Sequence, residues 1–169
     1  VMSHSETDNI ILADLLRTSQ ARLELISCIV AGDALAGALK GNSCCLRLTP
    51  SRGDEGLVQL EIHALFLALA ENEGLVELDM SNQSITDENW ATLCRSVRTH
   101  PTLEVLDLRF TTNRRGLTCP VRKNQRALAL VEMLQENTVL HTIRTSHDEC
   151  CQRVIQESIR PSLQTNRFW

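Results

Sequence analysis

The chain has 169 residues, which suits one domain, and its 43% hydrophobic and 22% charged residues are ordinary for a soluble globular protein. A formal net charge of −4 gives no general attraction to nucleic acid or membrane, and no apolar run approaches the roughly 18 residues of a membrane helix. The aromatic content is only 3%, so the core must be aliphatic.

The cysteines predict a reducing, cytoplasmic environment. There are seven, and an odd count that includes two adjacent pairs is a poor disulfide framework. No basic segment followed by an apolar one opens the chain, so we predict no secretory signal. The Val before Met2 suggests a piece of a longer protein, whose native N-terminus is then missing.

The first predicted element is a helix over residues 8–19. Asp8 can cap it, and Ile11, Leu12, Leu15 and Leu16 give it an apolar face. Arrays of repeats need such caps because a terminal repeat cannot bury both its faces. We therefore expect a single domain over 1–169, with an N-terminal capping helix at 1–19, repeats at 20–147, and a C-terminal capping helix and tail at 148–169.

Strand and helix patterns alternate through the repeats. Strands are predicted over 22–30, 45–49, 75–81, 103–109 and 140–145, and helices over 34–40, 58–71 and 125–136, with a further helix that Asp87 caps and Pro101 ends. The register of the second strand stays open. The helix ends favour Cys45 as the first repeat position, and the leucines favour a slip of two residues.

The third and fourth strands carry the clearest repeat. The pattern L-x-x-L-x-L begins at Leu75 and, 28 residues later, at Leu103. A polar residue stands three positions before each strand start, at Asn42, Asn72, His100 and Asn137. Strand starts at Cys45, Leu75, Leu103 and Leu140 give intervals of 30, 28 and 37 residues. One strand and one helix at this period are typical of leucine-rich repeats.

Residues 20 to 150 resemble the ribonuclease-inhibitor type of leucine-rich repeat (LRR) protein. The matching positions are Leu23, Leu25, Cys28, Val30, Leu75, Leu78, Met80, Gln83, Ile85, Leu103, Leu106, Leu108 and Thr111. The resemblance implies an α/β solenoid. In it, about five parallel strands form the concave side of a short curved arc and helices form the convex side. It also implies protein binding, because such strands present a regular grid of side chains on a stiff scaffold.

The outward grid, read by the period of two, is acidic in the centre and basic at the flanks. Its charged residues include Arg47, Glu77, Asp79, Asp107, Arg109 and Arg144. Two interpretations stay open. The face either docks a basic partner segment, or it is a solvated face whose charges pair across strands, such as Arg47 with Asp79 and Asp107 with Arg144.

Two other segments are candidate partner surfaces. The predicted loop 112–124 carries Arg114, Arg115, Arg122 and Lys123, which suit an acidic partner or simply a solvated insertion. It has no interleaved aromatic residues, so we expect no nucleic-acid partner. The terminal Phe168 and Trp169 suit an assembly contact or simple packing on the last helix.

The sequence predicts no enzyme, cofactor or metal. It has no phosphate-binding glycine loop and no Cys or His pairs at structural zinc spacing. We therefore predict a non-catalytic interaction module that binds another protein through the strand face or the basic loop. The alternative is a structural subunit or terminal fragment of a larger receptor or assembly.

Overall fold

The computed structural model describes residues 11, 13–15, 17–18, 23–28, 32–40, 42–43, 45–50, 59–109, 111 and 120–145. The described residues between 11 and 18 are helical, in agreement with the predicted opening helix. The predicted C-terminal capping helix and tail at 148–169, with Phe168 and Trp169, lie outside the described residues. None of the helices in the described ranges is long and apolar enough to cross a membrane.

Strands and helices alternate along the described chain. The strands are β1 (Leu23–Cys28), β2 (Cys45–Pro50), β3 (Glu77–Asp79), β4 (Val105–Leu108) and β5 (Thr142–Thr145), and the helices are α2 (Gly32–Leu39), α3 (Gln59–Leu69), α4 (Asp87–Val97) and α5 (Pro120–Glu136). The strands form one parallel sheet in the order β1-β2-β3-β4-β5. The predicted α/β class with parallel strands in one sheet is therefore confirmed.

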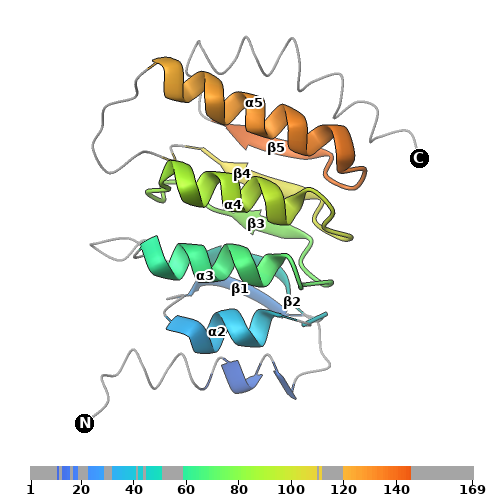
Figure 1. Ribbon diagram of the computed structural model, residues 1–169. Coiled ribbons are helices and arrows are strands. Elements are labelled where there is room, and N and C mark those ends of the chain that lie inside the picture. Colours follow the sequence, from blue (N-terminus) through green and yellow to red (C-terminus); the bar gives the residue numbers. More distant parts are fainter. Residues whose placement is uncertain are drawn as a thin grey trace.

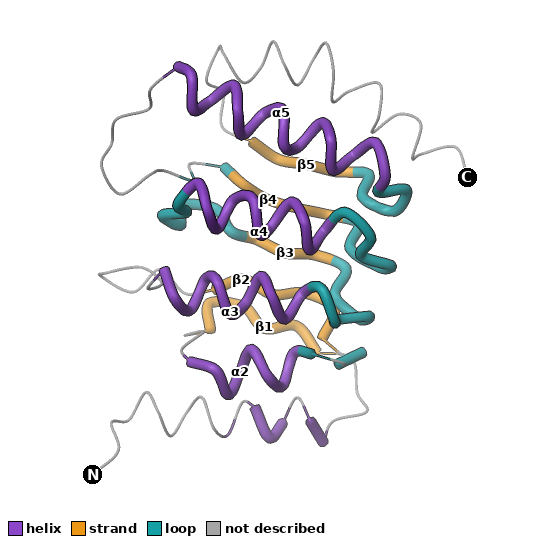
Figure 2. Tube along the Cα trace, in the orientation of Figure 1, coloured by secondary structure: helices purple, strands orange, loops and turns teal. Residues whose placement is uncertain are grey.

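The helices form a second layer against one face of the sheet (Figures 1 and 2). Each helix contacts the next one in the chain, so α2, α3, α4 and α5 lie side by side. Parallel strands require a crossover between them, and here each crossover from α2 to α5 is one helix on the same side. The opposite face of the sheet is left free of helices in the described part of the chain.

The register of the strands settles the open question at the second strand. Leu48 pairs with Leu78, which pairs with Leu106, and this places Cys45 in line with Leu75. Cys45 is therefore the first repeat position, as the helix ends indicated. In the first strand, Cys28 pairs with Pro50 of the second strand, inside the sheet.

The core lies between the two layers. It is built mostly from aliphatic side chains, as the composition indicated, with Phe66 and Trp90 as aromatic members. Fully buried members include Leu48, Leu78 and Leu106 from the sheet, and Leu65, Phe66, Leu69, Leu93, Val97, Met133 and Leu134 from the helices. Burying one such side chain stabilises a fold by roughly 1.5–3 kcal/mol, so the layer contact holds the helices in place.

Two helices begin at residues other than those predicted. Thr86, and not Asp87, caps α4, because its hydroxyl accepts a hydrogen bond from the Asn89 backbone N–H at 3.2 Å. The helix α5 begins at Pro120, a residue favoured at the first helical position because its missing N–H would have no partner there. Arg122 and Lys123 therefore belong to a helix and not to the loop predicted over 112–124.

A buried polar side chain occupies each described turn from a helix to the next strand. The four residues are Asn42, Asn72, His100 and Asn137, all at most 6% exposed. Each accepts a hydrogen bond from the backbone N–H three residues later, at 2.6–3.1 Å. These bonds satisfy strand-start amides that the turn would otherwise bury without a partner. The spacing of three residues seen in the sequence therefore reflects this hydrogen bond between a polar side chain and the backbone N–H three residues later.

Candidate functional site

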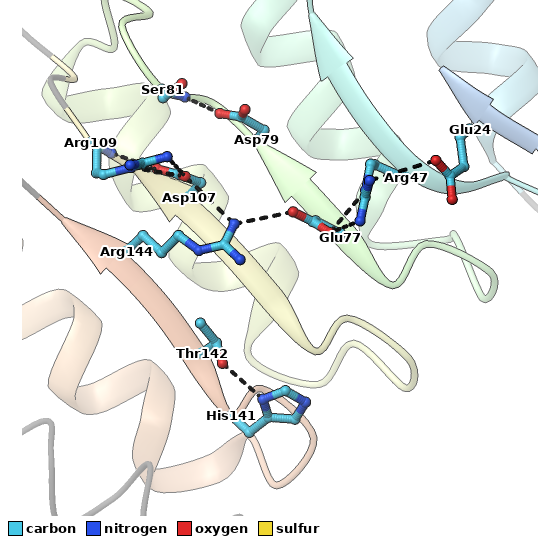
Figure 3. A network of polar contacts seen from close by, with 10 residues as sticks. All are labelled: Glu24, Arg47, Glu77, Asp79, Ser81, Asp107, Arg109, His141, Thr142 and Arg144. Atoms are coloured by element: carbon cyan, nitrogen blue, oxygen red, sulfur yellow. Dashed lines mark hydrogen bonds and ion pairs between the residues drawn. The ribbon is translucent and has the colours of Figure 1, made fainter. Parts of the chain in front are cut away.

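A network of charged side chains covers the free face of the sheet (Figure 3). Successive side chains of a strand point to opposite faces, so the residues beside Leu48, Leu78 and Leu106 point away from the helices. The strand register then places Glu24 opposite Arg47, Arg47 opposite Glu77, and Asp107 opposite Arg144. Opposite charges on neighbouring strands are therefore brought together by the fold.

Arg47 links the first three strands. Its Nε and Nη2 donate to Glu77 Oε2 at 2.9 and 2.6 Å, and its Nη1 lies 3.6 Å from Glu24 Oε2. All three guanidinium nitrogens are thus engaged. Such pairs at a partly exposed face contribute little stability each, but a connected set fixes the side chains in one arrangement.

Asp107 is the buried centre of the network. Its side chain is 1% exposed although it points to the free face, because the side chain of Arg109 covers it. Arg109 donates through Nε and Nη2 at 2.7–3.0 Å, and its backbone N–H donates to the same carboxylate at 3.0 Å. Burial alone would raise the pKa of Asp107, but the hydrogen bonds and charge of Arg109, with the charge of Arg144, hold it below the usual 3.8.

Arg144 joins the two halves of the network. Its Nη1 donates to Glu77 Oε1 at 3.1 Å and lies 3.7 Å from Asp107 Oδ2. Since Glu77 also binds Arg47, one line of ion pairs runs from β1 to β5. The pairing of Asp107 with Arg144 is one of the two anticipated from the sequence.

The other anticipated pair, Arg47 with Asp79, is wrong. Arg47 reaches Glu77, which stands directly opposite it in the register. Asp79 is opposite Asp107, as predicted, and its Oδ1 accepts a hydrogen bond from the Ser81 backbone N–H at 2.8 Å. It forms no ion pair within the described ranges.

The structure thus brings together five of the predicted residues, with Asp79 beside them. They are Arg47, Glu77, Asp107, Arg109 and Arg144. The other predicted residues are not part of this network as described. Arg114 and Arg115 lie outside the described residues, as do the side chains of Arg122 and Lys123.

Two further contributions to this face come from residues outside the predicted site. Glu24, 55% exposed, lies on the outward grid that the period of two predicts and extends the network to β1 through Arg47. His141 Nε2 lies 3.1 Å from Glu104 Oε2 just before β5 and β4, in turns where periodicity gives no information. No group of three or more His, Cys, Asp or Glu that suits a metal occurs in the described parts of the chain.

Comparison with known proteins assigns the fold. No protein-family model and no curated protein matches the sequence. Among solved structures, the chain is similar to leiomodin-1 actin-binding site 2, with 16% identity, a TM-score of 0.67 and coverage of 99% of this chain and 91% of that one. It is also similar to the tropomodulin C-terminal domain from Caenorhabditis elegans, with 15% identity, a TM-score of 0.70 and coverage of 98% and 94%.

The chain has the fold of these two domains. This corrects the family assignment made from the sequence, because the matching structures are leiomodin and tropomodulin domains and no family model supports the ribonuclease-inhibitor type. The reason is physical. The pattern L-x-x-L-x-L with a following helix reports which positions must be buried between a sheet and a helix layer, and it does not distinguish families that share this packing.

Proposed function

We propose that this chain is a non-catalytic protein-binding module and that its partner is actin. The observation that carries the proposal is the similarity to leiomodin-1 actin-binding site 2 across 99% of this chain. The charged face consists of hydrogen-bond donors and acceptors held on adjacent strands, an arrangement suited to recognition.

We place the partner surface on the free face of the sheet and describe the fold as a short leucine-rich-repeat-like arc. In support, each described strand lies next to its neighbour in sequence, and the four described turns before β2, β3, β4 and β5 repeat the same buried hydrogen bond. A stiff scaffold of this kind presents side chains at fixed positions, which lowers the ordering cost of binding.

We also propose a cytoplasmic location. Cys45 and Cys94 are free and buried, and burial raises the pKa of the Cys94 thiol to about 12, so this thiol stays protonated and unreactive. Free thiols of this kind suit a reducing compartment.

The test is binding of the purified full chain to actin filaments, by co-sedimentation, and to actin monomers, by fluorescence. A double variant, Arg47→Gln with Arg144→Gln, removes the two cations that link the strands. We expect it to bind at least about tenfold more weakly, since several charge-assisted contacts are lost. Thermal unfolding of the variant establishes that it folds.

A matched control uses an ion pair away from the sheet. Lys40 Nζ and Glu71 Oε1 lie 2.7 Å apart in the turns after α2 and α3. The double swap Lys40→Glu with Glu71→Lys should leave binding unchanged. If the wild-type chain binds neither form of actin, the proposed partner is wrong.

Two variants test the alternative surfaces. Binding lost in Arg114→Glu with Arg115→Glu, but kept in the sheet variant, moves the surface to the 112–124 segment. Removal of Phe168 and Trp169 tests the second candidate function, a subunit of a larger assembly. That function predicts loss of stoichiometric co-purifying proteins on truncation, with no effect of the sheet variant.

A further inference from the structure

The three arginines of the sheet face differ in how many donors they have already used. Arg47 engages all three guanidinium nitrogens. Arg109 engages Nε and Nη2 on Asp107. Arg144 engages only Nη1, and its Nε and Nη2 have no partner among the described residues.

The two unused nitrogens of Arg144 lie on one edge of the guanidinium. The Nε and Nη2 of an arginine form a planar fork whose spacing matches the two oxygens of a carboxylate. Arg109 uses this same edge to bind Asp107, so one example of the geometry is present on the same face. The equivalent edge of Arg144 meets no partner in the part of the chain that the structure describes.

The position of Arg144 favours an incoming anion. Its side chain is 44% exposed, whereas its two carboxylate partners, Glu77 and Asp107, are 18% and 1% exposed. The arginine is therefore closer to solvent at this point than the two carboxylates with which it pairs. Figure 3 shows one end of the Arg144 guanidinium directed at these carboxylates and the other directed away from them.

The same contacts hold the open edge in place. Arg144 Nη1 is fixed by two carboxylates from two other strands, at 3.1 and 3.7 Å. A side chain that is already anchored loses less conformational freedom when it binds a further group. The open edge is thus preorganised.

We propose that Arg144 binds a carboxylate of an acidic side chain, on a partner segment that lies across β4 and β5. This rests on the proposed function, in which the sheet face is the partner surface, and it specifies the chemistry of the partner there. It reverses the charge expected from the sequence. Glu77 and Asp107 are already paired with arginines within the chain, so at β4 and β5 the groups left for a partner are the cationic donors of Arg144. Asp79, on β3, forms no ion pair within the described ranges.

The experiment is an NMR titration of the arginine Nε–H resonances in the full chain with a capped tetraglutamate peptide. We expect the Arg144 Nε–H signal to shift saturably. Arg95, an exposed arginine in the last turn of α4 with no polar contact among the described residues, is the matched control and should not saturate. Equal shifts at Arg95 and Arg144 would overturn the proposal, because they would show unspecific attraction.

Two further arms test the chemistry. The variant Arg144→Lys keeps the charge and removes the fork, so it should weaken tetraglutamate binding by about tenfold. Unchanged affinity in this variant would contradict a bidentate contact. Inorganic phosphate should give a weaker shift at Arg144 than the peptide, and an equal or stronger one would replace the carboxylate by a phosphate ligand.

The titration separates the two proposals. A saturable shift at Arg144 in a chain that does not bind actin supports the carboxylate site and rejects the actin partner. Actin binding that is unaffected by Arg144→Lys, in a chain without the shift, supports the partner and rejects the site.

Discussion

The turn before β3 and the turn before β4 perform the same task with different side chains. Asn72 accepts hydrogen bonds from the Gly74 and Leu75 backbone N–H groups, at 3.0 and 2.8 Å. Its amide nitrogen also donates to the carbonyls of Leu39 and Asn42 in the preceding repeat, at 2.6 and 2.8 Å. This asparagine therefore connects the strand that follows it to the turn of the repeat before.

His100 makes only the first half of these contacts. Its Nδ1 accepts bonds from the Thr102 and Leu103 N–H groups, at 3.3 and 3.1 Å. The neutral ring then carries its proton on Nε2, which is buried and has no hydrogen-bond partner among the described residues. An imidazole supplies one acceptor and one donor, and here the donor is lost. The comparison shows that the side-chain acceptor positions the residues at the start of the strand, while the side-chain donor binds the preceding repeat.

The largest effect expected from this comparison is that of Asn72→Ala. It removes the acceptor of two buried N–H groups and the donor to two buried carbonyls, so we expect a loss of about 4 kcal/mol in the free energy of unfolding. His100→Ala should cost about half as much, because it removes only the acceptor. Urea unfolding of both variants measures the difference. Equal losses would mean that the donor contacts of Asn72 contribute nothing.

The second-largest expected effect is that of acid, which should destabilise the turn that contains His100. Burial lowers the pKa of His100 from 6.5 to about 4. Between pH 6.5 and 4, His100 therefore binds a proton in the unfolded chain but stays neutral in the folded chain. Stability is full above pH 6.5, and about 3 kcal/mol is lost as the pH falls to 4.

Protonation of Nδ1 would also remove both bonds to the start of β4. Unfolding measured in steps from pH 7 to pH 4 tests this, with His100→Asn as the control that lacks this loss. The low pKa of Asp107 places its own contribution below pH 3.8, outside this window.

A third difference lies at the residue directly before the first repeat position, which is Leu75 in one repeat and Leu103 in the next. Gly74 is packed so closely that an added Cβ would stand 2.4 Å from Ser43 Cα. The matching position before β4 is Thr102, whose hydroxyl donates to the Leu75 carbonyl at 3.0 Å. We expect Gly74→Ala to cost about 2–3 kcal/mol, because backbone must move to admit the methyl group. Thr102→Ala should cost about 1 kcal/mol in the same urea unfolding assay, and a reversed order of the two losses would contradict the packing argument.

These turns show how far the sequence alone predicts the fold. The spacing of Asn42, Asn72, His100 and Asn137 from the strands could be read directly, since one repeated hydrogen bond imposes it. The alternation of strands and helices followed from burial in the same way. The protein family could not be predicted from the sequence, because the repeat pattern shows only which positions are buried.

The members of the charged face were predictable from the sequence, whereas only one of the two anticipated ion pairs, Asp107 with Arg144, is present. The period of two placed Arg47, Glu77 and Asp107 on one face. Which charges pair depends on the register between the strands. The parallel register places Arg47 opposite Glu77, so Arg47 pairs with Glu77 and not with Asp79. The cover that Arg109 forms over Asp107 is a rotamer choice that strand periodicity does not contain.

The smallest expected effect is a gain, from His100→Asn. The asparagine should keep the two acceptor contacts and direct its amide nitrogen to the Leu69 carbonyl. That position corresponds to the Val97 carbonyl, which Asn137 already binds at 2.6 Å. One added buried hydrogen bond and one fewer unpaired donor should stabilise the chain by about 1 kcal/mol at pH 7. The gain should exceed that value at pH 5, where the histidine costs stability. Asn137→His is the inverse control and should lose both the stability and the acid resistance. If His100→Asn destabilises the chain at both pH values, the imidazole fills volume in this turn that outweighs its unpaired donor.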